Sequence, residues 1–311
     1  MSCKRSAVHS LIDTAPDTQP MSLSQAICFI SQILGQAGID DAPAEAELLL
    51  CHTVGLSRTQ LYTNLGKTLT VAEAHRLGQL AQRRRHHEPT AYIIKQWEFY
   101  GLDFYIDQRV LIPRPETELL VEQAIEAAFY HSHKKSLIIA DIGTGSGVIA
   151  ISLALALPQA RIYATDISMS ALEVAEINCR RHEVDGQVKL LQGNLLGPLP
   201  EPVDMIVANL PYIRDCELKM LSPEIADFEP AAALDGGEDG LDKIRSLLAQ
   251  IPAKICPGGC LLMEIGQGQA QTVTALINAY FPESSIELIP DLGGIDRVVK
   301  AALAGFALTY V

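Results

Sequence analysis

The chain is poor in the features that stabilise secreted proteins and small metal-bound domains. Its seven cysteines are odd in number, are scattered along 311 residues and include no Cys-x-x-Cys pair. This spacing argues against a disulfide framework and a zinc ribbon. Cysteines that are neither paired nor clustered are typical of reduced thiols. We expect a cytoplasmic protein that holds no metal.

Long apolar runs and positive charge are also scarce. No apolar run reaches about 18 residues, the length that a membrane-spanning helix needs, and the N-terminus lacks the apolar segment of a signal peptide. The formal net charge is −13, with 24 Lys and Arg against 37 Asp and Glu. The lack of a long apolar run predicts no membrane contact. Because nonspecific binding of nucleic acids depends on basic surface, we also expect no direct contact with nucleic acid.

The chain does contain enough apolar material for a sizeable core. At 48% hydrophobic, its 311 residues can form one large domain and a smaller one. The polar residues 1–20 show no periodicity and predict a disordered tail. We divide the remainder into a helical domain at 21–88, a linking β-hairpin at 89–108 and an α/β domain at 109–311. We expect the protein to be a monomer.

The helical domain is predicted from apolar residues that recur at helical spacing. Helices are expected from residue 21 onward, over 41–54 and over 70–86. In the second of these helices, Ala44, Leu48 and Cys51 should face the core, with Leu49 beside them. In the third, Leu77 and Leu80 should do so.

A basic cluster closes the last of these helices. Arg83, Arg84 and Arg85 are consecutive in the sequence. One interpretation is a patch that contacts an acidic partner surface. The other is a set of cations placed favourably at a helix C-terminus. The sequence leaves both open.

Strands and helices alternate in the α/β domain. Short apolar runs predict strands near 137–141, 161–165, 187–191, 203–208 and 260–265. This alternation predicts a doubly wound, mostly parallel sheet. Two further runs, 286–289 and 297–300, are separated by too short a gap for a crossover helix. We therefore expect them to form an antiparallel hairpin at the edge of a seven-stranded sheet.

A glycine-rich loop follows the first of these strands, after Asp141. The loop contains Gly143, Thr144, Gly145, Ser146 and Gly147. A strand, a glycine loop and a helix form the usual nucleotide cradle of α/β proteins. The loop lacks the third glycine of a dinucleotide fingerprint and the lysine of a P-loop. A carboxylate at Asp141 suits a ligand that carries an ammonium and a sulfonium group, and S-adenosylmethionine fits that description.

Asp166 ends the next predicted strand, 166 − 143 = 23 residues after the first glycine of the loop. A carboxylate about 20 residues beyond such a loop typically accepts hydrogen bonds from a ribose. The alternative is a helix N-cap, because residues 168–181 have a helical pattern. We favour the ribose role, since the strand ends at the edge where α/β proteins bind ligands.

The most informative stretch is Asn209-Leu210-Pro211-Tyr212, directly after a predicted buried strand. The Asn209 carboxamide would lie at the ligand-binding edge of the sheet. Pro211 keeps Leu210 out of helical angles, so that the Leu210 carbonyl can point outward. Tyr212 adds an aromatic face. Two acceptors and a ring suit a planar group with N–H donors, either an amide or an aromatic amine, and the alternative is an ordinary proline turn.

These motifs together resemble those of class I methyltransferases that act on planar nitrogen. A finer resemblance, to the PrmC/HemK family, extends from about Met21 to about Lys300. It rests on residues 109–118, 209–213, 228–230 and 234–240. The Arg-Pro-Glu-Thr-Glu part of the first segment is the most specific, because general amino methyltransferases lack it. The chain has Leu210 where the family usually has proline, a change that keeps the backbone carbonyl.

The resemblance implies a class I methyltransferase fold with a small helical domain that recognises the substrate. It implies methyl transfer from S-adenosylmethionine to the side-chain amide of the glutamine in the Gly-Gly-Gln motif of class I peptide chain release factors. These proteins of translation termination are therefore the expected partners. Asn209, Pro211 and Tyr212 are expected to act in catalysis. These three residues and Leu210 are expected to bind the substrate amide.

Four further residues are assigned to the site, each with an alternative. In this fold Asn194 and Leu195 would approach the adenine, although flanking glycines also fit an ordinary turn. Arg114 and Glu116 would cap the active site or clamp the substrate backbone. They are equally compatible with a surface ion pair that contributes little.

Two other functions compete with this one. A methyltransferase for adenine or guanine could use the same pocket with a flipped base, but the acidic balance and the Arg-Pro-Glu-Thr-Glu segment argue against it. A noncatalytic module that binds S-adenosylmethionine is opposed by the presence of both Asn209 and Tyr212 beside the glycine loop.

Overall fold

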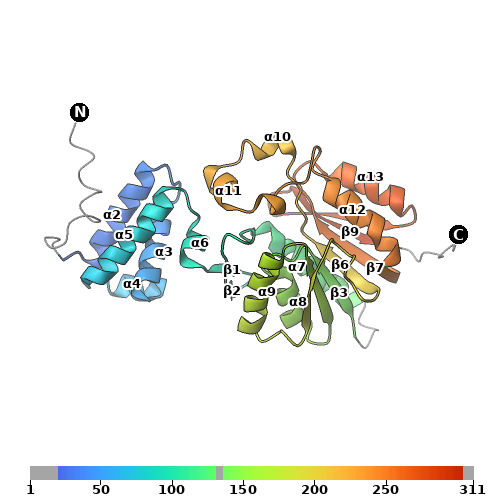
Figure 1. The fold of residues 1–311 in the computed structure, drawn as a ribbon, viewed down its shortest axis with the longest axis horizontal. Helices are drawn as coiled ribbons and strands as arrows, with labels where there is room; N and C mark the ends of the chain where they lie inside the picture. The colour runs from blue at the N-terminus through green and yellow to red at the C-terminus, as the bar shows by residue number, and fades with distance from the viewer. Residues whose placement is uncertain (1–19, 131–135, 304–311) are drawn as a thin grey trace. The chain divides into compact units, whose positions relative to one another are not determined.

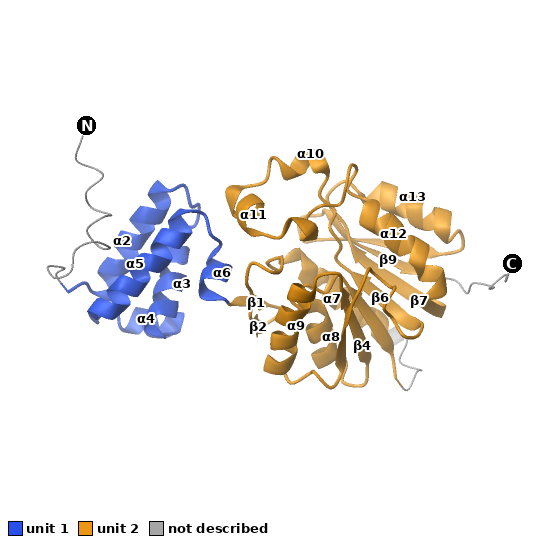
Figure 2. Ribbon diagram, in the orientation of Figure 1, with its two compact units in different colours: residues 1–95 blue, residues 96–311 orange. Residues whose placement is uncertain are grey.

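The computed structural model describes residues 20–130 and 136–303 (Figure 1). The predicted tail at 1–20 lies outside these residues except for its last position. The chain divides into two compact units, residues 1–95 and 96–311 (Figure 2). Each unit has a hydrophobic core of its own and is described separately.

The first unit is helical throughout its described part. Its helices are α2 (Leu23–Gln36), α3 (Ala42–Val54), α4 (Arg58–Thr63), α5 (Val71–Arg85) and α6 (Thr90–Ile94). Helices α2, α4 and α5 each begin with a capping box, in which a Ser or Thr and a Gln or Glu three residues later bind each other's backbone N–H groups. Leu77 and Leu80 are buried on α5, as predicted.

The predicted inward face of α3 is wrong except at Leu49, which is buried. Leu48 is 48% exposed, and Ala44 and Cys51 are only partly buried. The buried residues are Ala42, Ala46, Glu47, Leu49, Leu50 and Thr53. Helix α3 contacts α2, α4, α5 and α6, so several neighbours decide which of its side chains are covered. The periodicity of a single segment does not contain that information.

A short hairpin opens the second unit. It consists of β1 (Trp97–Phe99) and β2 (Leu102–Phe104), paired antiparallel. Tyr100 and Gly101 both have positive φ, 53° and 71°, as a two-residue type I′ turn requires. The hairpin occupies only part of the segment from 89 to 108, because residues 90–94 form α6.

The second unit is built on a seven-stranded sheet with the order β5-β4-β3-β6-β7-β9-β8. The strands are β3 (Ile138–Ile142), β4 (Arg161–Asp166), β5 (Val188–Gln192), β6 (Val203–Ala208), β7 (Ile255–Glu264), β8 (Ser285–Pro290) and β9 (Asp296–Ala302). Strands β3 to β7 pair in parallel, and β9 pairs antiparallel with both β7 and β8. The predicted parallel sheet with a terminal antiparallel hairpin is confirmed.

Helices and short turns connect these strands. They are α7 (Glu116–Tyr130), α8 (Val148–Ala156), α9 (Met169–Arg181), α10 (Asp215–Leu218), α11 (Pro223–Phe228), η1 (Ala231–Ala233), α12 (Asp242–Gln250), η2 (Ile251–Ala253) and α13 (Ala270–Tyr280). The winding reverses between β3 and β6. Because crossovers are right-handed, the helices that follow strands on the two sides of this reversal cover opposite faces of the sheet.

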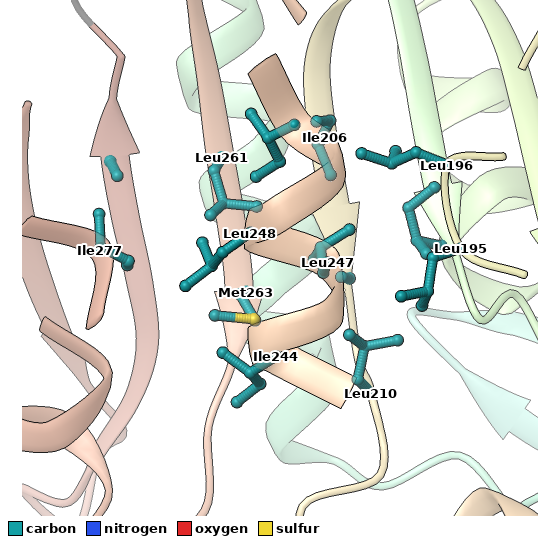
Figure 3. Close-up of a cluster of buried hydrophobic side chains, with 14 of the residues drawn as sticks. Leu195, Leu196, Ile206, Leu210, Ile244, Leu247, Leu248, Leu261, Met263 and Ile277 are labelled. Carbon is teal, nitrogen blue, oxygen red and sulfur yellow. The ribbon is translucent and has the colours of Figure 1, made fainter. Parts of the chain in front are cut away.

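The core of this unit lies against β6 and β7. Figure 3 shows Ile244, Leu247 and Leu248 of α12 among Ile206, Leu261 and Met263 of the two strands. Leu210, from the turn after β6, belongs to the same buried cluster and is 4% exposed. The turn that was singled out from the sequence is therefore anchored in the core through its second residue.

The strand register brings the two main sequence motifs together. Ile142, the last residue of β3, pairs with Ala208, the last residue of β6. Gly143 and Asn209 therefore leave neighbouring parallel strands at the same edge, at the point where the winding reverses. Open α/β sheets bind their ligands at such a reversal point.

Within the described residues, no helix is long and apolar enough to cross a membrane.

Candidate active site

The glycine loop after β3 has a backbone that favours glycine. Gly143, Gly145 and Gly147 have φ values of 73°, 54° and 85°, where residues with a Cβ are strained. A Cβ on Gly147 would lie 3.3 Å from the Cβ of Ala175, so glycine also lets α8 and α9 approach closely. The carbonyl of Thr165, at the end of β4, accepts hydrogen bonds from the N–H groups of Gly143 and Thr144, both at 2.9 Å.

Asp166 connects the loop to the next strand. Its Oδ2 accepts a hydrogen bond from the Gly145 N–H at 2.9 Å, and its Oδ1 accepts one from the Ser168 N–H at 2.8 Å. The N-cap of α9 is Ser168, whose side chain accepts a hydrogen bond from the Ala171 N–H, so the N-cap alternative for Asp166 is wrong. Asp166 lines the cavity beside the glycine loop, where a ribose acceptor is expected. Burial raises the pKa of the Asp166 carboxyl, although the hydrogen bonds oppose this effect.

Asp141 lies underneath the loop and is fully buried. Its Oδ2 accepts hydrogen bonds from the Thr144 hydroxyl at 2.6 Å and the Ala150 N–H at 3.1 Å. Among the described residues its Oδ1 has no hydrogen-bond partner. Burial raises the pKa of the Asp141 carboxyl to about 7.

Two cavities meet at the turn after β6. The glycine-loop cavity is lined by Gly143, Gly145, Asp166, Asn194, Leu195, Lys243 and further residues. The tyrosine cavity is lined by Arg114, Tyr212, Ile225, Leu234, Glu264 and further residues. Five residues line both: Leu111, Asn209, Leu210, Pro211 and Ala233. The turn thus forms part of the wall of each cavity.

The side chain of Asn209 is held from behind by a buried hydrogen-bonded chain. Its Nδ2 donates to Thr117 Oγ1 at 3.1 Å, and the Thr117 hydroxyl donates to Glu264 Oε2 at 2.7 Å. The Tyr212 hydroxyl donates to Glu264 Oε1 at 3.3 Å. Burial raises the pKa of the Glu264 carboxyl, and burial together with this carboxylate raises the pKa of Tyr212.

A second glycine-rich segment packs onto the turn. Residues 213 and 235 form a bridge, and the Gly236 N–H donates to the Ile213 carbonyl at 2.9 Å. A Cβ on Gly236 would lie 2.8 Å from the Cα of Tyr212, and one on Gly240 would lie 2.4 Å from its carbonyl oxygen. Gln269 Nε2 donates to that same carbonyl at 3.1 Å. Gly236 and Gly240 are therefore explained by close backbone contact with the turn.

The two charged residues assigned from the Arg-Pro-Glu-Thr-Glu segment lie in different places. Arg114 lines the tyrosine cavity and binds the buried Glu229 at 2.6 Å between Nη2 and Oε1. Glu116 lines neither cavity and lies 3.9 Å from Arg297. An ion pair of that length between partly exposed groups contributes little.

Leu195 combines a cavity position with an unusual backbone. Its φ is 53°, its side chain is buried, and its carbonyl accepts a hydrogen bond from the Thr165 hydroxyl at 3.0 Å. Non-glycine residues with positive φ are often found at functional sites. Asn194 is exposed and lines the same cavity.

The structure thus brings most of the predicted site residues together. Those that line a cavity are Arg114, Gly143, Gly145, Asp166, Asn194, Leu195, Asn209, Leu210, Pro211 and Tyr212. Those that line neither are Asp141, Thr144, Ser146, Gly147 and Glu116, of which all but Glu116 support the loop from below or within. Across residues 20–130 and 136–303, no group of three His, Cys, Asp or Glu side chains is placed to hold a metal ion.

Sequence reasoning missed Thr117, Glu264 and Lys243. Glu264 had a usable signal, because it ends an apolar strand at the ligand-binding edge of the sheet. Thr117 lay inside a segment already recognised as specific, but its burial was not predicted. Lys243 lies in α12 and lines the glycine-loop cavity, and no local pattern distinguishes it.

Comparisons with known proteins agree with this geometry. Residues 25–94 match the PrmC N-terminal domain family, and residues 116–225 match the methyltransferase small domain family. The release factor glutamine methyltransferase of Geobacter sulfurreducens is 41% identical over 268 residues, covering 86% of this chain and 91% of that protein. Its counterpart in Moorella thermoacetica is 42% identical over 282 residues, covering 90% and 98%.

A solved structure shares the fold. The hMettl16 catalytic domain, determined in complex with the MAT2A 3'UTR hairpin 6, superposes with a TM-score of 0.54 at 14% identity. The match covers 75% of this chain and 84% of that one. At this identity the likeness concerns the methyltransferase fold alone.

Proposed function

The chain belongs to the release factor glutamine methyltransferase family, and from this premise we propose that it methylates the glutamine side-chain amide in the Gly-Gly-Gln motif of class I peptide chain release factors. The methyl donor is S-adenosylmethionine. The observation that carries the proposal is the Asn209–Tyr212 turn, which walls both the glycine-loop cavity and the tyrosine cavity. A methyl donor in the first cavity and an amide in the second would meet at this turn.

The residues of the glycine-loop cavity fit the proposed donor. Glycines at 143 and 145 allow a ligand to approach the backbone closely, and Asp166 is a charged acceptor for the ribose hydroxyls. Asn194 and Leu195 suit the amine edge and the face of an adenine. The unpaired buried oxygen of Asp141 adds negative potential beneath the loop, which favours a cationic ligand. When bound, S-adenosylmethionine supplies an electrophilic methyl group on its sulfonium.

The tyrosine cavity supplies what an amide nucleophile needs. An amide nitrogen is a weak nucleophile because its lone pair is delocalised into the carbonyl, so its orientation in line with the methyl group matters most. Asn209 Oδ1 and the Leu210 carbonyl would accept its two N–H bonds and stabilise positive charge as it develops on nitrogen. Tyr212 would cover the amide plane and exclude water. Arg114, held by Glu229, is available at the rim for the substrate backbone.

A labelling assay tests the function directly. The full chain is incubated with S-adenosylmethionine carrying a labelled methyl group and, in parallel, with a class I release factor, duplex DNA or ribosomal RNA. We expect label on the release factor alone, at the glutamine of its Gly-Gly-Gln motif. A release factor with that glutamine replaced is the control and should stay unlabelled. Label on either nucleic acid instead would refute the proposal.

A further inference from the structure

Thr117 is hydrogen-bonded to the Asn209 carboxamide, and Glu264, which lines the tyrosine cavity, is hydrogen-bonded to Thr117. They come from the first turn of α7 and the last residue of β7, 147 positions apart in the sequence. Both are buried, at 2% exposure each. Together with Asn209 they form a chain of two hydrogen bonds. The amide Nδ2 donates to the Thr117 hydroxyl, and that hydroxyl donates to the Glu264 carboxylate.

The direction of this chain decides which atom Asn209 presents to the substrate. The two ends of a carboxamide have nearly the same shape, but one donates hydrogen bonds and the other accepts them. A substrate amide nitrogen carries N–H donors, so it needs the Oδ1 end. A rotated Asn209 would present its own N–H₂ group and could not accept either hydrogen.

Glu264 determines the donor-to-acceptor direction of the two hydrogen bonds. An ionised carboxylate only accepts, so the Thr117 hydroxyl must donate its single proton to it. The Thr117 oxygen then offers only lone pairs to Asn209, and Nδ2 is the group that can use them. We propose that Glu264 and Thr117 are positioning residues that set the orientation of the Asn209 carboxamide, and that Glu264 does so in its ionised form. This inference rests on the proposed function, since it concerns the acceptor of the substrate amide.

The surroundings of Glu264 agree with this role. Tyr212 donates its hydroxyl proton to the other carboxylate oxygen, so both oxygens act as acceptors. The charged groups that act on Glu264 are Glu116 of α7 and Arg297 of β9, which have opposite effects on its charge, and Arg114 lines the same cavity. Burial raises the pKa of the Glu264 carboxyl. Protonation would let Glu264 donate to Thr117 and would free the Thr117 hydroxyl to donate to Asn209, which reverses the chain.

Two substitutions at Thr117 separate positioning from packing. Thr117→Val has the same shape but no hydroxyl, whereas Thr117→Ser keeps the hydroxyl and loses a methyl group. If the chain orients Asn209, Thr117→Val should lower kcat on release factor by about 10- to 100-fold, less than the loss of a direct transition-state contact. Thr117→Ser should stay within about threefold of the wild type. If Thr117 only fills space, the order is reversed, because valine fits and serine leaves a void.

Binding and folding measurements accompany the kinetics. Affinity for S-adenosylmethionine by calorimetry should change less than about threefold in Thr117→Val, and its melting temperature should stay close to that of Thr117→Ser. A loss of turnover that follows a loss of donor binding or of folding in both variants would overturn the proposal. Equal kcat values in the two variants would overturn it as well.

The pH profile tests the role of the Glu264 charge. At saturating donor, kcat of the wild type should fall as the pH drops through the raised pKa of Glu264. Glu264→Gln cannot be protonated in this range, so its kcat should lose that acid limb. An unchanged acid limb in Glu264→Gln would refute the role of the carboxylate. The wild type in the same assay is the control for the proposed function. If the wild type leaves release factor unlabelled, the proposed function fails and the inference fails with it. If the wild type is active and Thr117→Val has the same kcat, only the inference fails.

Discussion

At the scale of single residues, the site depends on a few polar side chains whose environments differ sharply. Asn209 is half-buried between two cavities, Asp166 is hydrogen-bonded at a cavity wall, and Asp141 is sealed beneath the glycine loop. The side-chain oxygens of these three residues are therefore expected to have different roles, in catalysis, donor binding and stability. Substitutions at these three positions should consequently separate catalysis, donor binding and stability.

Asn209→Ala should lower kcat by about 10²-fold or more, the scale for loss of one preorganised transition-state contact. Affinity for S-adenosylmethionine should remain largely intact, because the glycine loop and Asp166 are unchanged. Steady-state kinetics on release factor and calorimetric titration of the donor measure the two quantities. Turnover close to that of the wild type would remove Asn209 from the mechanism.

Asp166→Ala should weaken binding of S-adenosylmethionine without unfolding the domain. Two hydrogen bonds from ribose hydroxyls to a charged acceptor contribute roughly 2–4 kcal/mol, which corresponds to an increase in Kd of about 30- to 10³-fold. Asp166→Asn keeps the shape and one acceptor oxygen, so its Kd for S-adenosylmethionine should lie between those of the wild type and Asp166→Ala. An unchanged Kd in a folded Asp166→Ala variant would leave this residue only its hydrogen bonds to the Gly145 and Ser168 N–H groups.

Asp141→Asn should change how stability depends on pH. The folded-state pKa of Asp141 is about 7, raised by burial from an ordinary value of 3.8. The native state therefore holds this proton more tightly than the unfolded state, and the wild type loses stability as the pH rises from about 4 to about 7. The neutral amide lacks this loss, which is on the order of a few kcal/mol.

The measurement for Asp141 is urea unfolding of both proteins, free of donor, at several pH values. The wild type should lose stability relative to Asp141→Asn across this window and level off above it. A constant difference between the two proteins from pH 4 to 8 would show that Asp141 titrates normally.

At the scale of elements, the turn after β6 is rigid because a distant segment packs on it. The 234–240 segment contacts the backbone of Tyr212 through glycines, and α12 begins directly after it. The family-specific segment at the start of α7 reaches the same turn through Thr117. Motifs that look independent in the sequence are thus parts of one structure.

Gly236→Ala should impair the turn more than the fold. The added Cβ would lie 2.8 Å from the Cα of Tyr212 and 2.9 Å from the backbone of Gly240, so one of these segments must move. We expect kcat on release factor to fall by about tenfold or more, since small displacements of positioning groups are costly. Gly186→Ala is the matched control, because its Cβ would meet nothing within 4 Å. Similar activity of the two variants would contradict this account.

At the scale of the whole molecule, the two compact units have different content. The glycine-loop and tyrosine cavities and their polar residues belong to the second unit. The proposed target, a glutamine side-chain amide, is too small to identify one protein among many. Selectivity must come from contacts remote from the reacting nitrogen. We propose that the helical unit provides these contacts.

A fragment that begins at Gln96 should bind S-adenosylmethionine within about threefold of the full chain and methylate release factor at least 10²-fold less efficiently. Its melting temperature serves as the control for folding. Full activity on intact release factor would overturn this division of roles. Within the full chain, Arg85→Glu should raise KM for release factor but not for the donor, and added salt should reduce the difference.

The three arginines of the basic cluster differ in burial and in ion pairing, and Arg85 is the one available to a partner. Arg84 is 3% exposed and paired with Glu45, and Arg83 is paired with Glu88. Arg83 and Arg85 are both exposed, but within the described part of the chain Arg85 is the one of the three without an ion pair. Reversing all three charges would bury a carboxylate at position 84 beside Glu45 and remove the Arg83 partner of the buried Glu88, and such changes cost several kcal/mol.

Local chemistry explains why so much of this protein could be predicted from its sequence. The strands, the glycine loop, Asp166 and the turn at Asn209 each depend on residues close together in the chain, through continuous apolar runs, positive φ and the restriction before proline. The alternation of strands and helices then leaves few topologies. The mostly parallel sheet and its terminal antiparallel hairpin were predicted in this way, whereas the strand order and the register that brings Gly143 beside Asn209 come from the structure.

Only the tertiary structure could decide which groups lie behind that turn. Thr117 and Glu264 come from different elements, and the phase of α3 and the burial of Arg84 depend on several packed neighbours. A residue's burial and its hydrogen-bond partners are set by side chains far away in the chain, and no local periodicity carries that information. The turn residues that line the proposed substrate cavity could therefore be predicted from the sequence, whereas Thr117 and Glu264, the buried groups hydrogen-bonded to them, could not.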